Sequence, residues 1–311
     1  MIPTINTPSS VINWDVEVSP SLFDIGYSDL NLSAIDSFNK KNHELNLMIT
    51  DPGRSQTTID SMISNNEVDA VEARKIIAKL AGSTQVNPGL MNLVLLGYVS
   101  SVEGYLRHLI RELVNLDPSV KEQCGLKTIN FGTTYFLSKE MFPEALMDSV
   151  SFISKKSIIE ACKELLDLNM NDQQGSSLHK ALNDYHSVCQ LRHCIVHRFG
   201  KIGATNAIKL GLNEHSYASC LEKPINMNYV AIQKVSKVTV NVVREVNQFI
   251  CSRVLKRLIK AGNTWVTWDY RKDKALWTKY ISLFYEAGGD PLADKAKNIY
   301  IELRKKHEAG E

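Results

Sequence analysis

The sequence predicts a mainly helical protein: a helical bundle with an irregular N-terminal arm and a C-terminal helical hairpin. Three long segments carry this expectation, because their apolar residues recur every three or four positions. The clearest segment follows Pro88 and is closed by Asp117 and Pro118. Its apolar residues are alternately four and three positions apart and share one helical face: Leu95, Val99, Val102, Leu106, Leu109 and Leu113.

The other two strong segments lie further along the chain. Ser177 is the expected N-cap of a helix that carries Leu178, Leu182, Tyr185 and Cys189 on one face and ends near Gly200. A still longer segment runs from about 232 to 260, and its length and spacing favour a helix although many of its residues are β-branched. A shorter amphipathic helix is expected over Ser154–Leu168.

Composition divides the chain into three regions. Residues 1–63 are rich in Ser, Asn, Asp and Pro, and we expect an irregular arm there with one short strand. Residues 64–261 form the expected helical domain, with a first helix near Val68 to Leu80 and a loop with a small hairpin at 201–226. Residues 262–311 form a C-terminal helical extension, with helices at Lys272–Ala287 and Pro291–Lys306 on either side of two glycines.

The chain of 311 residues, 44% of them hydrophobic, has ample material for a core. Its first residues lack the features of a signal peptide, and no apolar run approaches the roughly 20 residues of a membrane-spanning helix. The six cysteines are scattered without the spacing of zinc ribbons or redox pairs. We therefore expect a cytoplasmic protein with reduced thiols, no membrane contact and no cofactor.

Charge is polarised along the chain. Residues 1–60 carry eight acids against three bases, whereas residues 253–279 carry eight Lys or Arg against two Asp. Arg271 and Lys272 lie there among four aromatic residues, a mixture that suits stacking on bases and holding phosphates: Trp265, Trp268, Tyr270 and Trp277. The alternative is that these aromatics dock the terminal hairpin onto the core.

The segment with the most chemical information is the end of the helix that starts at Ser177. It places Arg192, a permanent cation, five positions before the imidazole of His197. At about 100° per residue the two side chains lie roughly 140° apart on an ideal helix. We therefore expect them to converge only if the last turn loosens or a partner chain contributes.

This segment resembles the signature of the HEPN family, in which an Arg, a polar residue, a few mostly apolar residues and a His lie near the end of the third helix of a four-helix up-and-down bundle. Here Arg192 is followed after four residues by His197, and His193 fills the polar position that often holds Asn. The helix Leu93–Leu116, with Glu103 beside its apolar stripe, looks like the family's first helix. The resemblance covers residues 90–260.

The resemblance implies a metal-independent endoribonuclease that acts by attack of the ribose 2′-hydroxyl on the adjacent phosphate, of the kind found among toxins and antiviral defence effectors, with tRNA as one candidate substrate. His197 would move a proton at the 2′-oxygen or at the leaving 5′-oxygen. Arg192 would stabilise the developing negative charge. His193 and Glu103 are supporting candidates, and Arg198, Arg271 and Lys272 are candidate RNA-binding residues. Expected partners are RNA, a second copy of the chain and an inhibitory or activating protein.

Two alternatives use the same residues. His193 and His197 are four apart, a spacing that occurs in zinc enzymes, and Cys189 or Cys194 would complete such a site. Glu103 would instead pair with Arg107 one turn away. At the level of function, the alternative is a non-catalytic HEPN-like module that dimerises or binds a nucleotide or a protein.

Overall fold

All regular structure is helical within the residues that the computed structural model of the protein describes, which are 32–49, 88–171, 175–212, 218–260, 266–286 and 291–308. The predicted mainly helical fold is therefore confirmed. No helix in these ranges is long and apolar enough to cross a bilayer.

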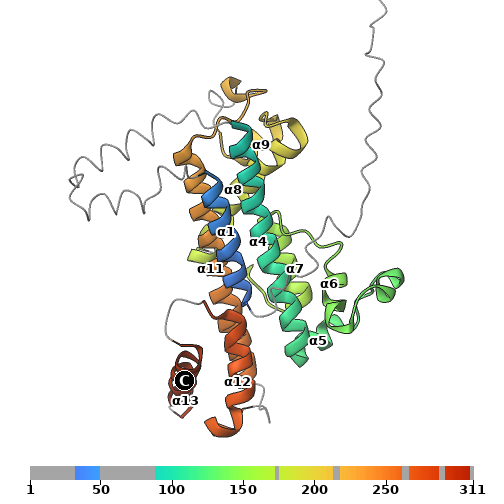
Figure 1. Cartoon of the computed structure of the whole chain (residues 1–311), viewed down its shortest axis with the longest axis vertical. Helices are drawn as coiled ribbons and strands as arrows, with labels where there is room; N and C mark the ends of the chain where they lie inside the picture. Colours follow the sequence, from blue (N-terminus) through green and yellow to red (C-terminus); the bar gives the residue numbers. More distant parts are fainter. Residues whose placement is uncertain are drawn as a thin grey trace, which may run out of the picture. The chain divides into compact units, whose positions relative to one another are not determined.

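A bundle of four helices forms the centre of the fold (Figure 1). Each of the four packs against at least two of the others. In chain order they are α1 (Ala34–Ile49), α4 (Pro88–Leu116), α8 (Ser177–Arg198) and α11 (Tyr229–Lys260).

Side-chain contacts fix the directions of these helices. The ring of Phe38 lies 6.4 Å from that of Tyr105, and Tyr98 donates to Asn46 at 2.8 Å, so α1 and α4 are antiparallel. Tyr105 also donates to Asn247 of α11. The end of α8 lies at the beginning of both α4 and α11, because Gly200 adjoins Asn92 and its carbonyl accepts from Ile225. The helices α1 and α8 therefore run against α4 and α11.

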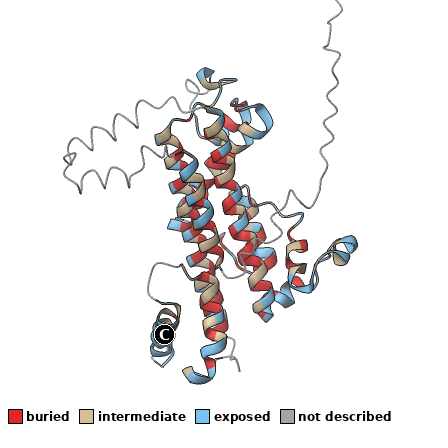
Figure 2. Cartoon of the chain, viewed as in Figure 1, coloured by how far each residue is buried: buried red, intermediate tan, exposed pale blue. Residues whose placement is uncertain are grey.

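The core lies between the facing sides of the long helices, where buried residues concentrate in Figure 2. The apolar stripe predicted for the first long segment is confirmed, since all six of its residues are buried. α4 begins at Pro88 and ends at Leu116, as its flanking residues predict. The third long segment is the helix α11, which reaches Lys260.

A buried ion pair ties the ends of α4 and α11 to the short helix α5 (Pro118–Cys124). Arg257 of α11 donates to Asp117 Oδ2 at 2.8 Å and to the carbonyl of Leu166 at 2.9 Å. The other carboxylate oxygen of Asp117 caps α5 by accepting from the backbone of Ser119 and Val120. One carboxylate thus both starts a helix and neutralises a half-buried cation.

Between α5 and α8 the chain forms short elements and one amphipathic helix. The expected loop with one short helix at 120–150 contains more helix than predicted: η3 (Phe131–Tyr135), η4 (Lys139–Met141) and α6 (Phe142–Leu146), besides α5. The predicted amphipathic helix is confirmed as α7 (Lys155–Leu166), which Ser154 starts with a capping box.

Three expectations need correction. Residues 34–49 of the expected irregular arm are the helix α1, whose Ile35 and Phe38 are buried in the core despite the polar composition around them. The N-cap of α8 is Ser176 rather than Ser177. The apolar part of 201–226 is the helix α9 (Ala204–Lys209), and only one isolated bridge, Lys201 to Pro224, remains of the expected hairpin. The rest of the arm and the helix expected near Val68 lie outside the described residues.

The C-terminal hairpin consists of α12 (Tyr270–Phe284) and α13 (Leu292–Glu308). Trp277 is buried between them, and its indole donates to the carbonyl of Ala296 at 2.8 Å. Trp268 and Tyr270 lie against the ring of Tyr300. These aromatics therefore pack α12 and the residues before it against α13, whereas Trp265 lies outside the described residues.

Candidate active site

The end of α8 is regular up to Arg198. Phe199 then adopts the left-handed conformation with φ of 52°, and its N–H bonds back to the carbonyl of Cys194. Gly200 follows with φ of 79°, a value that glycine adopts without strain. The expected loosening of the last turn is therefore wrong, because the left-handed cap ends the helix abruptly instead of unwinding it.

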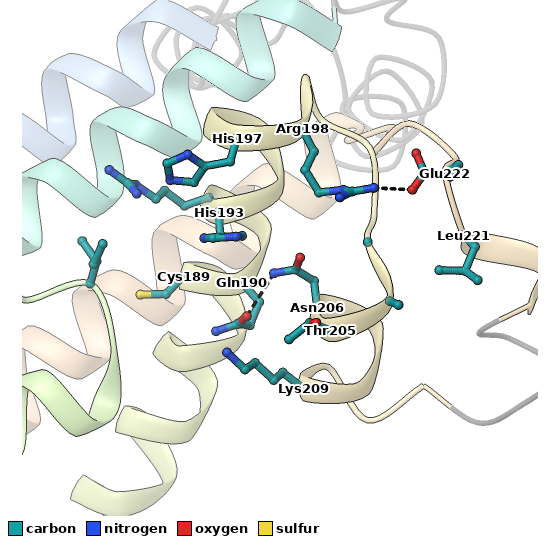
Figure 3. Close-up of a pocket in the computed structure, with 14 residues that line it drawn as sticks. Cys189, Gln190, His193, His197, Arg198, Thr205, Asn206, Lys209, Leu221 and Glu222 are labelled. Carbon is teal, nitrogen blue, oxygen red and sulfur yellow. Dashed lines mark hydrogen bonds and ion pairs between the residues drawn. The ribbon is translucent and has the colours of Figure 1, made fainter.

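The chain after Gly200 folds back over the polar side of α8. Cys194 is fully buried with Ile202 and Ala207 in a small separate cluster, which holds α9 in place. Backbone hydrogen bonds between Ile202 and the segment 222–223 add a second attachment. A cavity of about 710 Å3 is left between α8, α9 and the returning segment (Figure 3).

Four of the predicted site residues line this cavity: Arg192, His193, His197 and Arg198. Arg192 and His197 share the cavity without any change in the helix, because it extends around α8 and is not confined to one narrow stripe. His193, His197 and Arg198 are exposed, whereas Arg192 is half-buried. The segment that the sequence singles out is thus accessible to a ligand.

The two imidazoles lie together, with ring centroids 4.6 Å apart (Figure 3). Partial burial lowers the pKa of His193, and the charges of His197, Lys209, Arg192 and Arg198 lower it further. Because burial and the positive charges of Lys209, Arg192 and Arg198 all lower this pKa, His193 favours the neutral form at neutral pH. A neutral imidazole accepts a proton, and the site therefore contains a base next to His197.

Glu103 does not line the cavity. Its Oε1 lies 3.8 Å from Nε of Arg107, so Glu103 forms the pair with Arg107 that is the alternative to a role in the site. Nη1 of Arg107 also lies 3.0 Å from Oε1 of Glu144. Glu103 still acts electrostatically on Cys189, which lines the cavity. Burial raises the pKa of Cys189 to about 12; the charge of Glu103 also raises this pKa, and that of Arg192 lowers it.

Arg198 is held by an ion pair with Glu222 (Figure 3). Its side chain passes so close to Gly203 that a Cβ there would lie 2.8 Å from the guanidinium Nε. The absence of a side chain at position 203 therefore makes room for Arg198. Among the described residues that line the cavity, Glu222 alone carries a carboxylate.

Several residues of the cavity were not predicted from the sequence. Gln190 accepts from Asn206 at 3.1 Å, which connects α8 with α9, and Lys209 of α9 extends toward the same part of α8 (Figure 3). One signal in the sequence was available, because His186, Gln190, His193 and His197 recur at helical spacing on one polar stripe. Nothing in the sequence indicates that α9 folds back onto that stripe.

The structure does not bring every candidate to the site. Arg271 and Lys272 are exposed on α12 and do not line the cavity. Cys194 is buried away from the two imidazoles, and among the described residues no three His, Cys, Asp or Glu side chains are grouped as metal ligands. Two other histidines, His108 and His179, are buried, and the ring of His179 shares a hydrogen bond with the carbonyl of Met170.

Chemically, the arrangement suits an anionic ligand with a proton to transfer. Two imidazoles, two guanidinium groups and the ammonium of Lys209 line one open cavity against a single, already paired carboxylate. Comparison of the chain with protein-family models, with curated proteins and with solved structures gave no match. The function is therefore argued from these residues alone.

Proposed function

We propose that the protein is a metal-independent endoribonuclease of the HEPN type, with tRNA as one candidate substrate. The observation that carries the proposal is the shared cavity of Arg192, His193 and His197, in which imidazoles that exchange protons adjoin a fixed cation. Such cleavage has three chemical requirements: a proton acceptor, a proton donor and positive charge at the phosphate. All three are supplied by side chains.

The reaction needs no metal ion. The 2′-hydroxyl loses its proton to an imidazole, the 2′-oxygen bonds to phosphorus, the bond from phosphorus to the 5′-oxygen breaks, and the leaving oxygen takes a proton. The products are a 2′,3′-cyclic phosphate and a 5′-hydroxyl. His197 carries one of the proton transfers, with His193 as its supporting neighbour. Arg192 neutralises the charge that develops on the non-bridging oxygens, and Arg198 binds the RNA backbone.

We also propose that the enzyme is a homodimer whose two motifs face one cleft. Phe199 is 98% exposed and Val196 is 45% exposed, both within two positions of His197 in the chain, and Leu93 at the nearby start of α4 is 65% exposed. A non-glycine residue in the left-handed conformation costs about 1–2 kcal/mol. The exposed ring of Phe199 recovers none of this cost within one chain, which favours its burial against a second copy.

Cleavage of total tRNA in EDTA tests the ribonuclease proposal. We expect fragments with 2′,3′-cyclic phosphate and 5′-hydroxyl ends from the native chain and none from His197→Ala purified in parallel. Cleavage that EDTA abolishes, or that the His197→Ala preparation retains, would reject the mechanism. Binding of RNA without cleavage would instead support the non-catalytic module.

A cellular experiment tests the proposed role as a toxin or antiviral defence effector. Induced expression of the native chain should arrest growth while His197→Ala should not. Recovery of growth with a co-expressed protein would identify the expected inhibitory partner. Normal growth at full expression of soluble native protein would argue against an enzyme that is active without an activating signal.

A further inference from the structure

A second cavity, of about 370 Å3, lies on the same side of α8 as the first. It is formed between the first turns of α7 and the middle of α8. Its lining residues are Lys155, Lys156, Ile159, Glu160, Asn171 and His186. None of them belongs to the catalytic arrangement described above.

The polar stripe of α8 connects the two cavities. The amide of Gln190, which lines the first cavity, donates to Nε2 of His186, which lines the second, at 3.3 Å. Lys209 lines the first cavity with His193, and its charge lowers the pKa of both His193 and His186. From His197 to His186 the stripe covers eleven residues, or about 16 Å of helix axis at 1.5 Å per residue.

The connected surface has an excess of positive charge. Its permanent cations are Arg192 and Arg198 at one end, Lys209 in the middle, and Lys155 and Lys156 at the other end. Two carboxylates line the cavities, and each has a cation beside it: Glu222 pairs with Arg198, and Glu160 lies 3.7 Å from Lys156. Five cations against two carboxylates leave three positive charges uncompensated among the lining residues.

Lys155 and Lys156 lie where a positive charge destabilises α7. The first turn of this helix contains no acidic residue and begins with Lys155 and Lys156, so cations lie at the positive end of the helix dipole. Such placement is unfavourable by about 0.3–1 kcal/mol per charge. Lys155 donates to the neutral Asn183 at 2.8 Å, and none of the carboxylates that the structure describes forms an ion pair with it. An anion at this point would interact favourably with both lysines and with the helix end.

We propose that this surface, the α8 track, binds the backbone of a single-stranded RNA that extends from the scissile phosphate at His197 to Lys155 and Lys156. The inference rests on the proposed function and specifies its substrate as an unpaired strand several nucleotides long. The five cations lie on α7, α8 and α9, along the face of α8 that carries His186, Gln190 and His193. Such a row of positive charge suits a single backbone, as in other sequence-tolerant single-strand sites. His186, Gln190 and His193 then lie along the strand between the two ends.

Salt-dependent RNA binding tests the track. The protein is the full chain with His197→Ala, which binds without cleaving, and the probe is a labelled unstructured RNA of about 12 nucleotides. Fluorescence anisotropy gives the affinity between about 50 and 200 mM salt, and the logarithm of the affinity falls by about 0.7 per phosphate contact for each decade of salt. This dependence is the slope of the logarithm of the affinity against the logarithm of the salt concentration. Addition of both Lys155→Gln and Lys156→Gln to the His197→Ala chain should reduce its magnitude by about 1.4, and addition of Lys209→Gln alone by about 0.7.

Two matched variants complete the design. Lys279→Gln removes the same charge from an exposed position of α12 outside both cavities and should leave the slope unchanged. Lys155→Arg and Lys156→Arg keep both charges and should keep the slope. A duplex of the same length should bind more weakly than the single strand.

The outcomes separate this inference from the proposed function. If native protein cleaves tRNA while the lysine variants keep the slope of their parent, the track is wrong and the enzyme stands. If the lysine variants flatten the slope but the native chain never cleaves, the track stands and the enzyme is wrong. Absence of RNA binding at low salt, equal binding of duplex, or an equal effect of Lys279→Gln also overturns the track.

Discussion

Replacement of His197 by alanine separates chemistry from folding. The imidazole is exposed on the last turn of α8 and contacts the ring of His193. Loss of an exposed side chain usually changes stability by less than about 0.5 kcal/mol. The loss of a favourable interaction with the helix end, worth about 0.3–1 kcal/mol when the ring is protonated, is offset by the better helix propensity of alanine, worth up to about 0.7 kcal/mol. The net effect on stability should be near zero.

The effect on cleavage should be large. General acid–base catalysis contributes about 10²–10⁴-fold, which corresponds to roughly 3–5 kcal/mol of activation free energy at about 1.4 kcal/mol per decade. The assay is cleavage of total tRNA in EDTA under single-turnover conditions, with thermal unfolding of the same preparations. A cleavage rate near that of the native chain, or a loss of activity matched by a loss of folded protein, would refute the assignment of His197.

The control variant follows from the structure. Cys194→Ser is unsuitable as a control although Cys194 is next to His193 in the chain, because it would place a hydroxyl in the buried cluster with Ile202 and Ala207. His43→Ala removes the same group from an exposed position of α1 and should keep native cleavage. Arg192→Lys keeps the charge but loses the planar fork, and we expect weak activity at most.

Three further predictions concern stability and assembly. Asp117→Ala should cost about 3 kcal/mol or more in urea unfolding, because α5 loses its cap and Arg257 its carboxylate. Asp117→Asn keeps a capping oxygen and should cost less; a cost equal to that of Asp117→Ala would contradict the capping part, and no cost at all would contradict the ion-pair part. Phe199→Gly should relieve the left-handed strain, raise monomer stability by about 1 kcal/mol and dissociate the dimer in light scattering; a stable Phe199→Gly dimer would exclude this surface as the interface. Burial and the cations Lys209 and Lys155 lower the pKa of His186 in the folded protein. Between this lowered pKa and the usual value of about 6.5, the unfolded chain binds more protons than the folded one, so the free energy of unfolding should rise with pH across this window. His186→Gln should show a shallower rise in its unfolding free energy over this window, and identical slopes would show that His186 does not contribute.

The direction of the His186 effect has a local cause. Gln190 uses its amide nitrogen as the donor, and only a neutral imidazole nitrogen accepts that hydrogen bond. Nδ1 of His186 is buried without a hydrogen-bond partner among the described residues. Protonation would therefore break one hydrogen bond and leave a charged ring partly desolvated.

The helices of the bundle were largely predictable because their signals are local. The six-residue stripe of α4, the serine that starts α7 and the length of α11 follow from side chains a few positions apart in the sequence. The same locality made Arg192, His193 and His197 visible as one segment. α1 was not predicted because few of its residues are apolar, and the short face that is buried in the core is recognisable only from its packing against α4 and α11.

The sequence by itself determined the mainly helical fold and the segment that carries the proposed chemistry, since helical period and the types of neighbouring side chains are properties of a local stretch of chain. Tertiary structure alone decided what surrounds that segment. Lys209 reaches the site because Cys194, Ile202 and Ala207 pack together, and Lys155 comes near His186 because α7 lies against α8. These contacts join residues far apart in sequence, and their positions depend on how buried surfaces fit together.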